Sequence, residues 1–197
     1  TNPECMIQEI SRIEFSDEYI FIKDFKKLLQ FDRRGKFIRK IGSEGRGPGE
    51  YSALFDFSID EQEKEISIIS TSDHKLMIYS FDGVFKNSYK LSFRPMQMIP
   101  KDKNSLIYHL ANVPGGNDPS WIITSRKGIT SASIKNNLKR ISQPGLVVPY
   151  TPLYLYDNSA HFIEYGIDTF YYFKGNQKMP YAIFSIFTLI THPNHLD

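Results

Sequence analysis

The feature that most constrains the fold is an internal repeat marked by glycines. Two segments of the chain, 28–37 (LLQFDRRGKF) and 76–85 (LMIYSFDGVF), align without a gap. Their glycines belong to a series of four that recur 48, 45 and 47 residues apart: Gly35, Gly83, Gly128 and Gly175. A repeat of about 40–50 residues built from strand-like pieces is typical of a β-propeller.

Each repeat divides into short strand-like runs. The chain holds 15 phenylalanines and 12 tyrosines. Aromatic and β-branched runs alternate with turn residues about every ten positions, which indicates antiparallel strands. We therefore predict an all-β protein of four-stranded antiparallel blades, with an irregular tail at 185–197. The predicted blades cover residues 6–42, 54–91, 95–134 and 152–184. Each repeated glycine should lie in the hairpin before the fourth strand, where φ is positive.

Composition excludes several classes of protein. The 197 residues are 41% hydrophobic, carry a net charge of +2 and show no basic cluster, so we expect no nucleic-acid partner. The single cysteine, Cys5, excludes an internal disulfide framework and a multi-cysteine zinc site. The longest apolar run, 181–190, is too short to span a bilayer. The first residues are polar, so no signal peptide is visible.

A glycine-rich segment joins the first two repeats. Residues 42–51 read GSEGRGPGEY, which predicts an irregular crossing with neither strand nor helix. A phosphate cradle would need a helix to begin after the glycines, and none is predicted there. We therefore expect this segment to connect blades and not to bind phosphate.

Several of these pieces resemble a known family. The pattern in 31–42, 45–51, 55–60 and 167–173 resembles NHL-type repeats. It is more closely similar to the six-bladed propeller proteins of gut Bacteroidetes, many of which are lipoproteins. The resemblance implies six blades, a periplasmic or cell-surface location, and a non-catalytic or uncharacterised role. It supplies no catalytic residues to carry over. The chain accounts for about four of the six blades, so a truncated, non-functional fragment stays an open alternative.

Two charged residues are candidates for ligand contact. Arg46 is the one basic side chain within the glycine-rich segment, where its guanidinium could bind a carboxylate. The alternative, which the sequence favours, is a structural ion pair with Glu44 or Glu50. Asp56 lies on a predicted inner strand, where it could face a ligand or hydrogen-bond a neighbouring strand. Glu9 has a similar but weaker position.

Two ring side chains complete the candidate set. His109 lies on the second predicted strand of the third blade, and Trp121 follows a Gly-Gly-Asn-Asp-Pro segment. Trp121 could stack on a sugar, or it could belong to the core of the blade. His109 could contact a ligand, or it could be packed in the core as a neutral ring.

We predict a non-catalytic ligand- or protein-binding propeller whose partner is an unknown protein, peptide or glycan. No catalytic, cofactor or metal residue is assigned. The alternative is a lactonase- or lyase-type enzyme with a divalent metal such as calcium over the channel, which needs inward carboxylates from several blades. Open blade edges would favour self-association.

Overall fold

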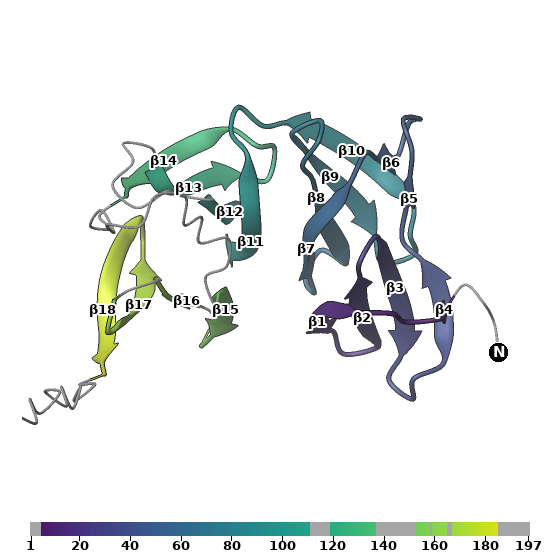
Figure 1. Cartoon of the computed structure of the whole chain (residues 1–197), viewed down its shortest axis with the longest axis horizontal. Helices are drawn as coiled ribbons and strands as arrows, with labels where there is room; N and C mark the ends of the chain where they lie inside the picture. Colours follow the sequence, from purple (N-terminus) through teal and green to yellow (C-terminus); the bar gives the residue numbers. More distant parts are fainter. Residues whose placement is uncertain (1–4, 111–118, 137–152, 158, 165–166, 185–197) are drawn as a thin grey trace, which may run out of the picture.

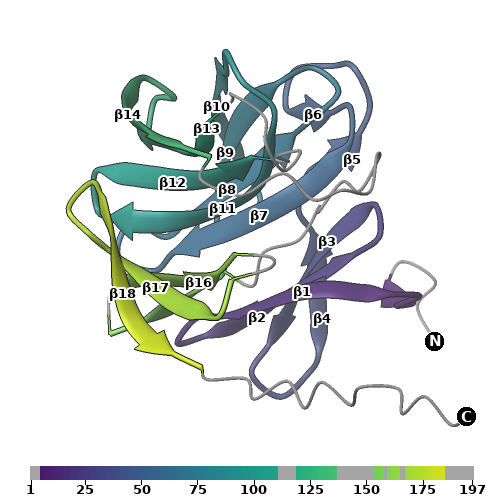
Figure 2. The ribbon, with the colours of Figure 1, turned by 60° about the vertical axis from the view of Figure 1, so that its left-hand side comes forward.

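The protein consists of four separate four-stranded antiparallel sheets, arranged as the blades of a β-propeller (Figure 1). This computed structural model describes residues 5–110, 119–136, 153–157, 159–164 and 167–184. No α-helix occurs within these ranges. Figure 2 shows that the sheets stay separate and do not merge into one sandwich. The predicted all-β propeller of four-stranded blades is therefore confirmed, while the predicted tail at 185–197 lies outside the described residues.

The strands follow one another in sequence order within each blade. The first blade contains β1 (Ile10–Phe15), β2 (Tyr19–Asp24), β3 (Lys27–Asp32) and β4 (Phe37–Lys40). The second contains β7 (Leu54–Asp60), β8 (Glu65–Ser70), β9 (Lys75–Ser80) and β10 (Phe85–Lys90). The third contains β11 (Pro95–Asp102), β12 (Ser105–Leu110), β13 (Pro119–Ser125) and β14 (Thr130–Lys135). The fourth contains β15 (Leu153–Tyr156), β16 (Ser159–Ile163), β17 (Thr169–Lys174) and β18 (Gln177–Ile183).

The repeated glycines have the backbone conformation that the sequence predicts. Their φ angles are +84°, +77°, +74° and +59° in chain order. In the first hairpin the Gly35 N–H donates to the Asp32 carbonyl at 3.0 Å. The same type of bond joins Gly83 to Ser80 and Gly128 to Ser125. Positive φ is costly for residues with a side chain, so glycine is required to start each outer strand with this turn.

The glycine-rich segment is more regular than the sequence predicts. It contains two short strands that pair in parallel, β5 (Ser43–Glu44) and β6 (Glu50–Tyr51). The prediction of no strand here is therefore wrong. The reason is a tight turn, in which the Glu50 N–H donates to the Gly47 carbonyl at 3.1 Å. The Glu50 carboxylate also accepts the Gly47 N–H at 2.8 Å. The two bonds close the turn, which brings β6 alongside β5.

Apolar clusters fill the spaces between consecutive blades. The first cluster joins blades one and two and includes Phe21, Phe57 and Tyr79. A second cluster, around Tyr108, joins blades two and three, and a third, around Trp121, joins blades three and four. Burial of these large side chains is the main force that holds neighbouring blades together.

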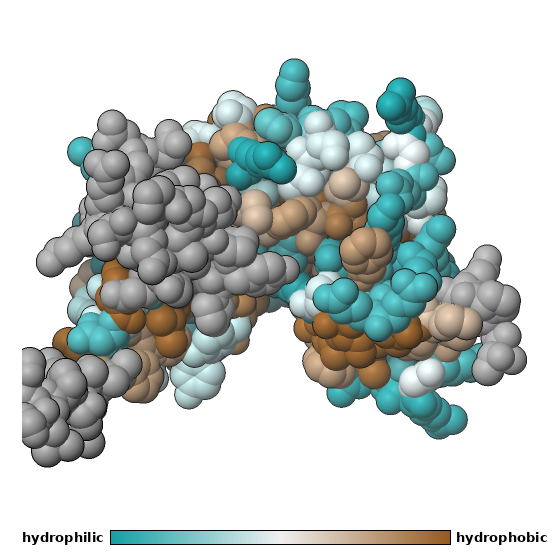
Figure 3. Space-filling view, in the orientation of Figure 1, coloured by the Kyte–Doolittle hydropathy of each residue, from teal (hydrophilic) through white to brown (hydrophobic). Residues whose placement is uncertain are grey.

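The two ends of the arc keep apolar faces that no other blade of the described residues covers. On the first blade, Ile13 is 41% exposed and Phe15 is 62% exposed. On the fourth, Tyr154 is 44% exposed and Tyr181 is 56% exposed. Figure 3 shows hydrophobic surface over both ends. These end faces have the composition of the interblade cores, but they lie in contact with solvent.

Candidate functional site

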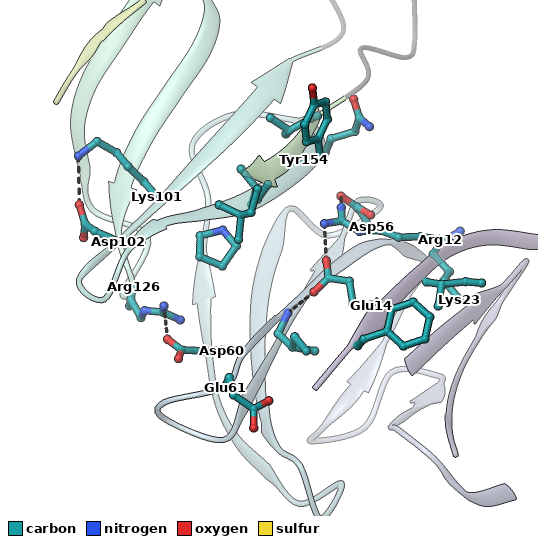
Figure 4. A pocket seen from close by; sticks show the side chains of 18 of the residues that line it. Arg12, Glu14, Lys23, Asp56, Asp60, Glu61, Lys101, Asp102, Arg126 and Tyr154 are labelled. Carbon is teal, nitrogen blue, oxygen red and sulfur yellow. Dashed lines mark hydrogen bonds and ion pairs between the residues drawn. The ribbon is translucent and has the colours of Figure 1, made fainter. Parts of the chain in front are cut away.

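A cavity of about 1110 Å³ lies where the innermost strands of the four blades meet (Figure 4). Its walls come from β1, β7, β11 and β15, and its rim includes turns of the second and third blades. A concave space of this size is large enough for a small ligand. Because each blade contributes its first strand, the propeller geometry itself produces the cavity.

Strand alternation decides which side chains reach the cavity wall between the first two blades. On β1, Arg12 and Glu14 alternate with Ile13 and Phe15, so the two charged side chains share one face. Arg12 forms ion pairs with Glu14 and with Asp56 of β7, the latter at 2.7 Å. The charged side chains are therefore enclosed between blades, while Ile13 and Phe15 stay exposed at the edge of the cavity.

This cluster also reaches the third blade. The Met98 N–H donates to Asp56 Oδ2 at 2.9 Å, and Arg12 donates to the Met98 carbonyl at 3.1 Å. Glu14 Oε2 accepts the Ile59 N–H at 2.8 Å. One guanidinium and two carboxylates thus connect the innermost strands of three blades. Such a network fixes the relative positions of the strands that line the cavity.

Burial shapes the ionisation of this cluster. It raises the pKa of Glu14 and of Asp56, and the neighbouring Arg12 charge opposes the rise. Burial also disfavours the charged form of Arg12, but Asp56 and Glu14 outweigh it and raise the pKa of the guanidinium. Arg12 therefore stays charged. It is shared between two carboxylates that both experience the cost of desolvation.

A second set of ion pairs lies near the turns of the second and third blades (Figure 4). Arg126 pairs with Asp60, and its Nε donates to the Lys103 carbonyl at 3.0 Å. Lys101 pairs with Asp102 at 3.1 Å. Burial opposes ionisation of Asp102, but hydrogen bonds within the following turn and the Lys101 ammonium outweigh it and lower its pKa to about 2. The Arg126–Asp60 pair ties the two blades together at a second level of the cavity.

Lys23 is a further charged residue of the wall. It lies on β2, directly opposite Arg12 in the register of the first blade. Its side chain is enclosed, and Nζ donates to Ser11 Oγ at 2.9 Å. Burial lowers the pKa of Lys23, while Asp56, Glu9 and Asp24 oppose that shift.

The rest of the wall is largely apolar. It includes Phe55, Ile99, Leu153 and Leu155, with the Tyr154 ring beside them. The site therefore combines apolar surface with a few fixed polar groups, which is the usual composition of a small-molecule pocket.

Of the four residues proposed from the sequence, Asp56 alone lines this cavity. Asp56 also accepts a hydrogen bond from Met98 of the neighbouring strand β11, as one of the two interpretations of the sequence predicts. Arg46 is exposed on the glycine-rich segment, away from the cavity wall. Its expected partners are engaged elsewhere, because Glu44 pairs with Lys26 and Glu50 bonds Gly47. Among the described residues Arg46 has no ion pair with either glutamate.

The two ring residues lie in the core between the third and fourth blades. Trp121 is 0% exposed and packs against Phe162, with ring centroids 4.3 Å apart. Its Nε1–H donates to Glu164 Oε1 at 2.9 Å, and Lys178 donates to Glu164 Oε2 at 2.6 Å. His109 packs on Trp121 at 4.7 Å, and burial lowers its pKa to about 4. With both rings enclosed, this arrangement supports packing and leaves no exposed Trp121 face for a sugar.

Sequence reasoning missed Arg12, Glu14 and Lys23. The available signal was an Arg-x-Glu pair within an otherwise apolar inner strand, opposite a lysine on the next strand. Glu9, which the sequence suggested instead, has an exposed side chain, and its N–H donates to Asp24 at 2.8 Å. Among the described residues, no group of three or more His, Cys, Asp or Glu side chains is arranged to hold a metal ion. The described part of the chain also has no helix with the length and hydrophobicity that a membrane span requires.

Residues 1–193 match the model of a family described as a domain of unknown function, DUF4934. The chain belongs to this family. No relative is found among curated proteins.

Solved structures show the same fold. The chain is similar to a Bacteroides fragilis protein described as a possible exported protein, with a TM-score of 0.78 and 20% identity over 94% of this chain and 53% of that one. A DUF4221 member from Bacteroides vulgatus gives a TM-score of 0.61 with 10% identity, over 91% and 59%. The WD40 domain of Toxoplasma gondii coronin gives 0.56 with 7%, over 88% and 45%. This DUF4934 chain therefore spans about half the length of these proteins, and such low identities show the fold alone.

Proposed function

We propose that this chain is a non-catalytic binding propeller whose ligand occupies the central cavity. The observation that carries the proposal is the cavity itself, which combines apolar walls with polar groups held by ion pairs across the blades. A preformed site lowers the entropic cost of binding. Propellers also serve many unrelated functions, so the argument rests on this site and not on the fold.

The metal-dependent lactonase or lyase is the weaker alternative. It needs carboxylate oxygens that are available to coordinate an ion above the channel. Asp56 and Glu14, the inward carboxylates near the axis, already accept hydrogen bonds from Arg12 and from backbone N–H groups. Calorimetric titration with calcium and zinc tests this alternative, and tight binding of either ion would favour the enzyme.

The proposed function is tested by screening small molecules for thermal stabilisation and by following each hit by NMR. A ligand that binds only the folded state raises the unfolding midpoint. We expect hits to bind without being converted to product. Leu155→Trp should abolish binding because Leu155 lines the cavity, whereas Tyr156→Trp, outside its wall, should not. Conversion of a bound hit to product, or binding that survives Leu155→Trp, would contradict the proposal.

We also propose that these blades belong to an NHL-like ring of six. The uncovered faces at the two ends support this, because exposed Phe15 and Tyr181 occupy surfaces that other blades bury. In the chain alone, the same faces favour self-association. A sharp monomer peak in sedimentation would count against self-association. A periplasmic or cell-surface location is supported by the relative described as possibly exported.

A further inference from the structure

The charges that line the cavity are unequally paired. Five carboxylates line it, and each has a cationic partner in an ion pair: Glu14, Asp56, Asp60, Glu61 and Asp102. Five cations line it as well, but among the described residues Lys23 and Lys103 have no ion-pair partner. The charged groups of the cavity that have no ion-pair partner are therefore two lysine ammonium groups.

Lys23 is the informative one of the two, because it is enclosed. Lys23 is only 7% exposed, whereas Lys103 is exposed to solvent. An ammonium group has three N–H donors. One of them bonds Ser11 Oγ at 2.9 Å, and within the described part of the chain no second acceptor is found for the others. A buried ammonium without enough acceptors is costly, so a ligand that supplies them gains binding energy.

We propose that the cavity binds a small organic monocarboxylate, whose carboxylate accepts hydrogen bonds from Lys23 Nζ and whose apolar body lies against Ile99, Leu153 and Leu155. This inference rests on the proposed function, since it names the ligand class for the same cavity. An ion pair formed inside such an enclosed site is stronger than one on the surface.

The surrounding charges select one negative charge over two. Arg12 forms ion pairs with both Glu14 and Asp56, and Lys23 is the enclosed cation of the cavity that has no ion-pair partner among the described residues. One added carboxylate meets the free donors of Lys23, but a second negative charge has no unpaired enclosed cation to meet among the described cavity residues. A dianion such as a phosphate ester should therefore bind more weakly than a carboxylate of the same shape.

The apolar walls select the body of the ligand. Phe55, Ile99, Leu153 and Leu155 line the cavity beside its polar groups. Removing apolar surface from water favours a ring or a branched hydrocarbon over a bare ion. Acetate, which has a single methyl group, should therefore bind less tightly than an aromatic acid.

The experiment compares 4-fluorobenzoate with its neutral analogue 4-fluorobenzamide, by fluorine NMR titration of the full chain. We expect the carboxylate to bind at least about tenfold more tightly than the amide. Phenyl phosphate should displace it only weakly. Lys23→Met should reduce the affinity for 4-fluorobenzoate to that for the amide. Lys90→Met, an exposed lysine on the outer strand β10, is the matched control and should leave both affinities unchanged.

Each outcome decides the proposal. Equal binding of acid and amide, or acid binding that survives Lys23→Met, would overturn it. If Leu155→Trp then removes both ligands, the cavity is still a binding site and the proposed function stands. Absence of binding by either compound at millimolar concentration counts against the carboxylate site, while a hit of other chemistry in the wider screen would keep the function. If Lys23→Met does not fold, the preference of the wild type and the Lys23→Arg variant decide the question.

Discussion

Removal of Arg12 should be among the most damaging single changes in this protein. Arg12→Met leaves Asp56 and Glu14 enclosed between blades without their shared cation. Breaking a buried pair from one side typically costs 3–5 kcal/mol. The Arg12 bond to the Met98 carbonyl and its position over the Phe57 ring are lost as well. We expect a loss of about 4 kcal/mol at pH 7.5, a large share of the roughly 5–15 kcal/mol typical of a domain.

The pH dependence tests the cause of that loss. Without Arg12, burial keeps the folded-state pKa of Asp56 and of Glu14 above the unfolded values. The folded variant then binds protons more tightly than the unfolded chain. Its stability is therefore greatest below the unfolded pKa of about 4 and is lost as pH rises through the folded pKa. The difference from wild type should shrink between pH 7.5 and pH 4.5.

Urea unfolding followed by far-ultraviolet circular dichroism measures both effects. Neutralising the carboxylates in the triple variant Arg12→Met, Glu14→Gln, Asp56→Asn should recover at least half of the loss, because no uncompensated charge stays buried. Arg34→Met, an exposed arginine in the first glycine hairpin, should change stability by about 0.5 kcal/mol or less. A cost below about 1 kcal/mol for Arg12→Met, or a cost independent of pH, would refute the reasoning.

Three further predictions concern the blades. Burial lowers the pKa of His109 to about 4, so the neutral ring stabilises the fold fully above the unfolded pKa of about 6.5, and this stability is lost as pH falls through 4. Between urea titrations at pH 7.5 and pH 4, the free energy of unfolding of the wild type should therefore fall by about 3 kcal/mol more than that of His109→Phe. Gly42→Ala should cost more than about 2 kcal/mol, because its Cβ would lie 2.9 Å from both the Tyr51 ring and the Tyr79 hydroxyl. Gly35→Ala, with open space around its Cβ, should cost about 1 kcal/mol in thermal melts. Trp121→Phe should cost about 2–4 kcal/mol in urea unfolding, because it removes the donor to Glu164 from a packed core; an unchanged midpoint would contradict that role.

The blade pattern could be predicted because it depends on local chemistry. Gly35 and Gly83 have positive φ in hairpins that each span only a few residues, and the alternation of strands and turns is equally local. The short pairing of β5 with β6 could not be predicted in this way. It depends on the Glu50 carboxylate folding back onto the Gly47 N–H, a contact that composition does not reveal.

The cavity was harder to predict because burial in a propeller depends on which blade lies alongside. Alternation on β1 gives two faces, and a hydrophobic pattern would place Ile13 and Phe15 inside. Instead, Arg12 and Glu14 face the second blade, because Asp56 and backbone groups of the neighbouring blades satisfy them there. The distance between such partners along the chain, 44 residues from Arg12 to Asp56, cannot be read from local periodicity.

The most direct test of the central cavity as the ligand site is methyl NMR of isoleucine- and leucine-labelled protein during titration with 4-fluorobenzoate. We expect the methyl signals of Ile99, Leu153 and Leu155 to shift together, while that of exposed Ile129, on the outer side of the third blade, stays in place. Shifts confined to Ile129 and other outer positions, with the cavity methyls unchanged, would contradict it.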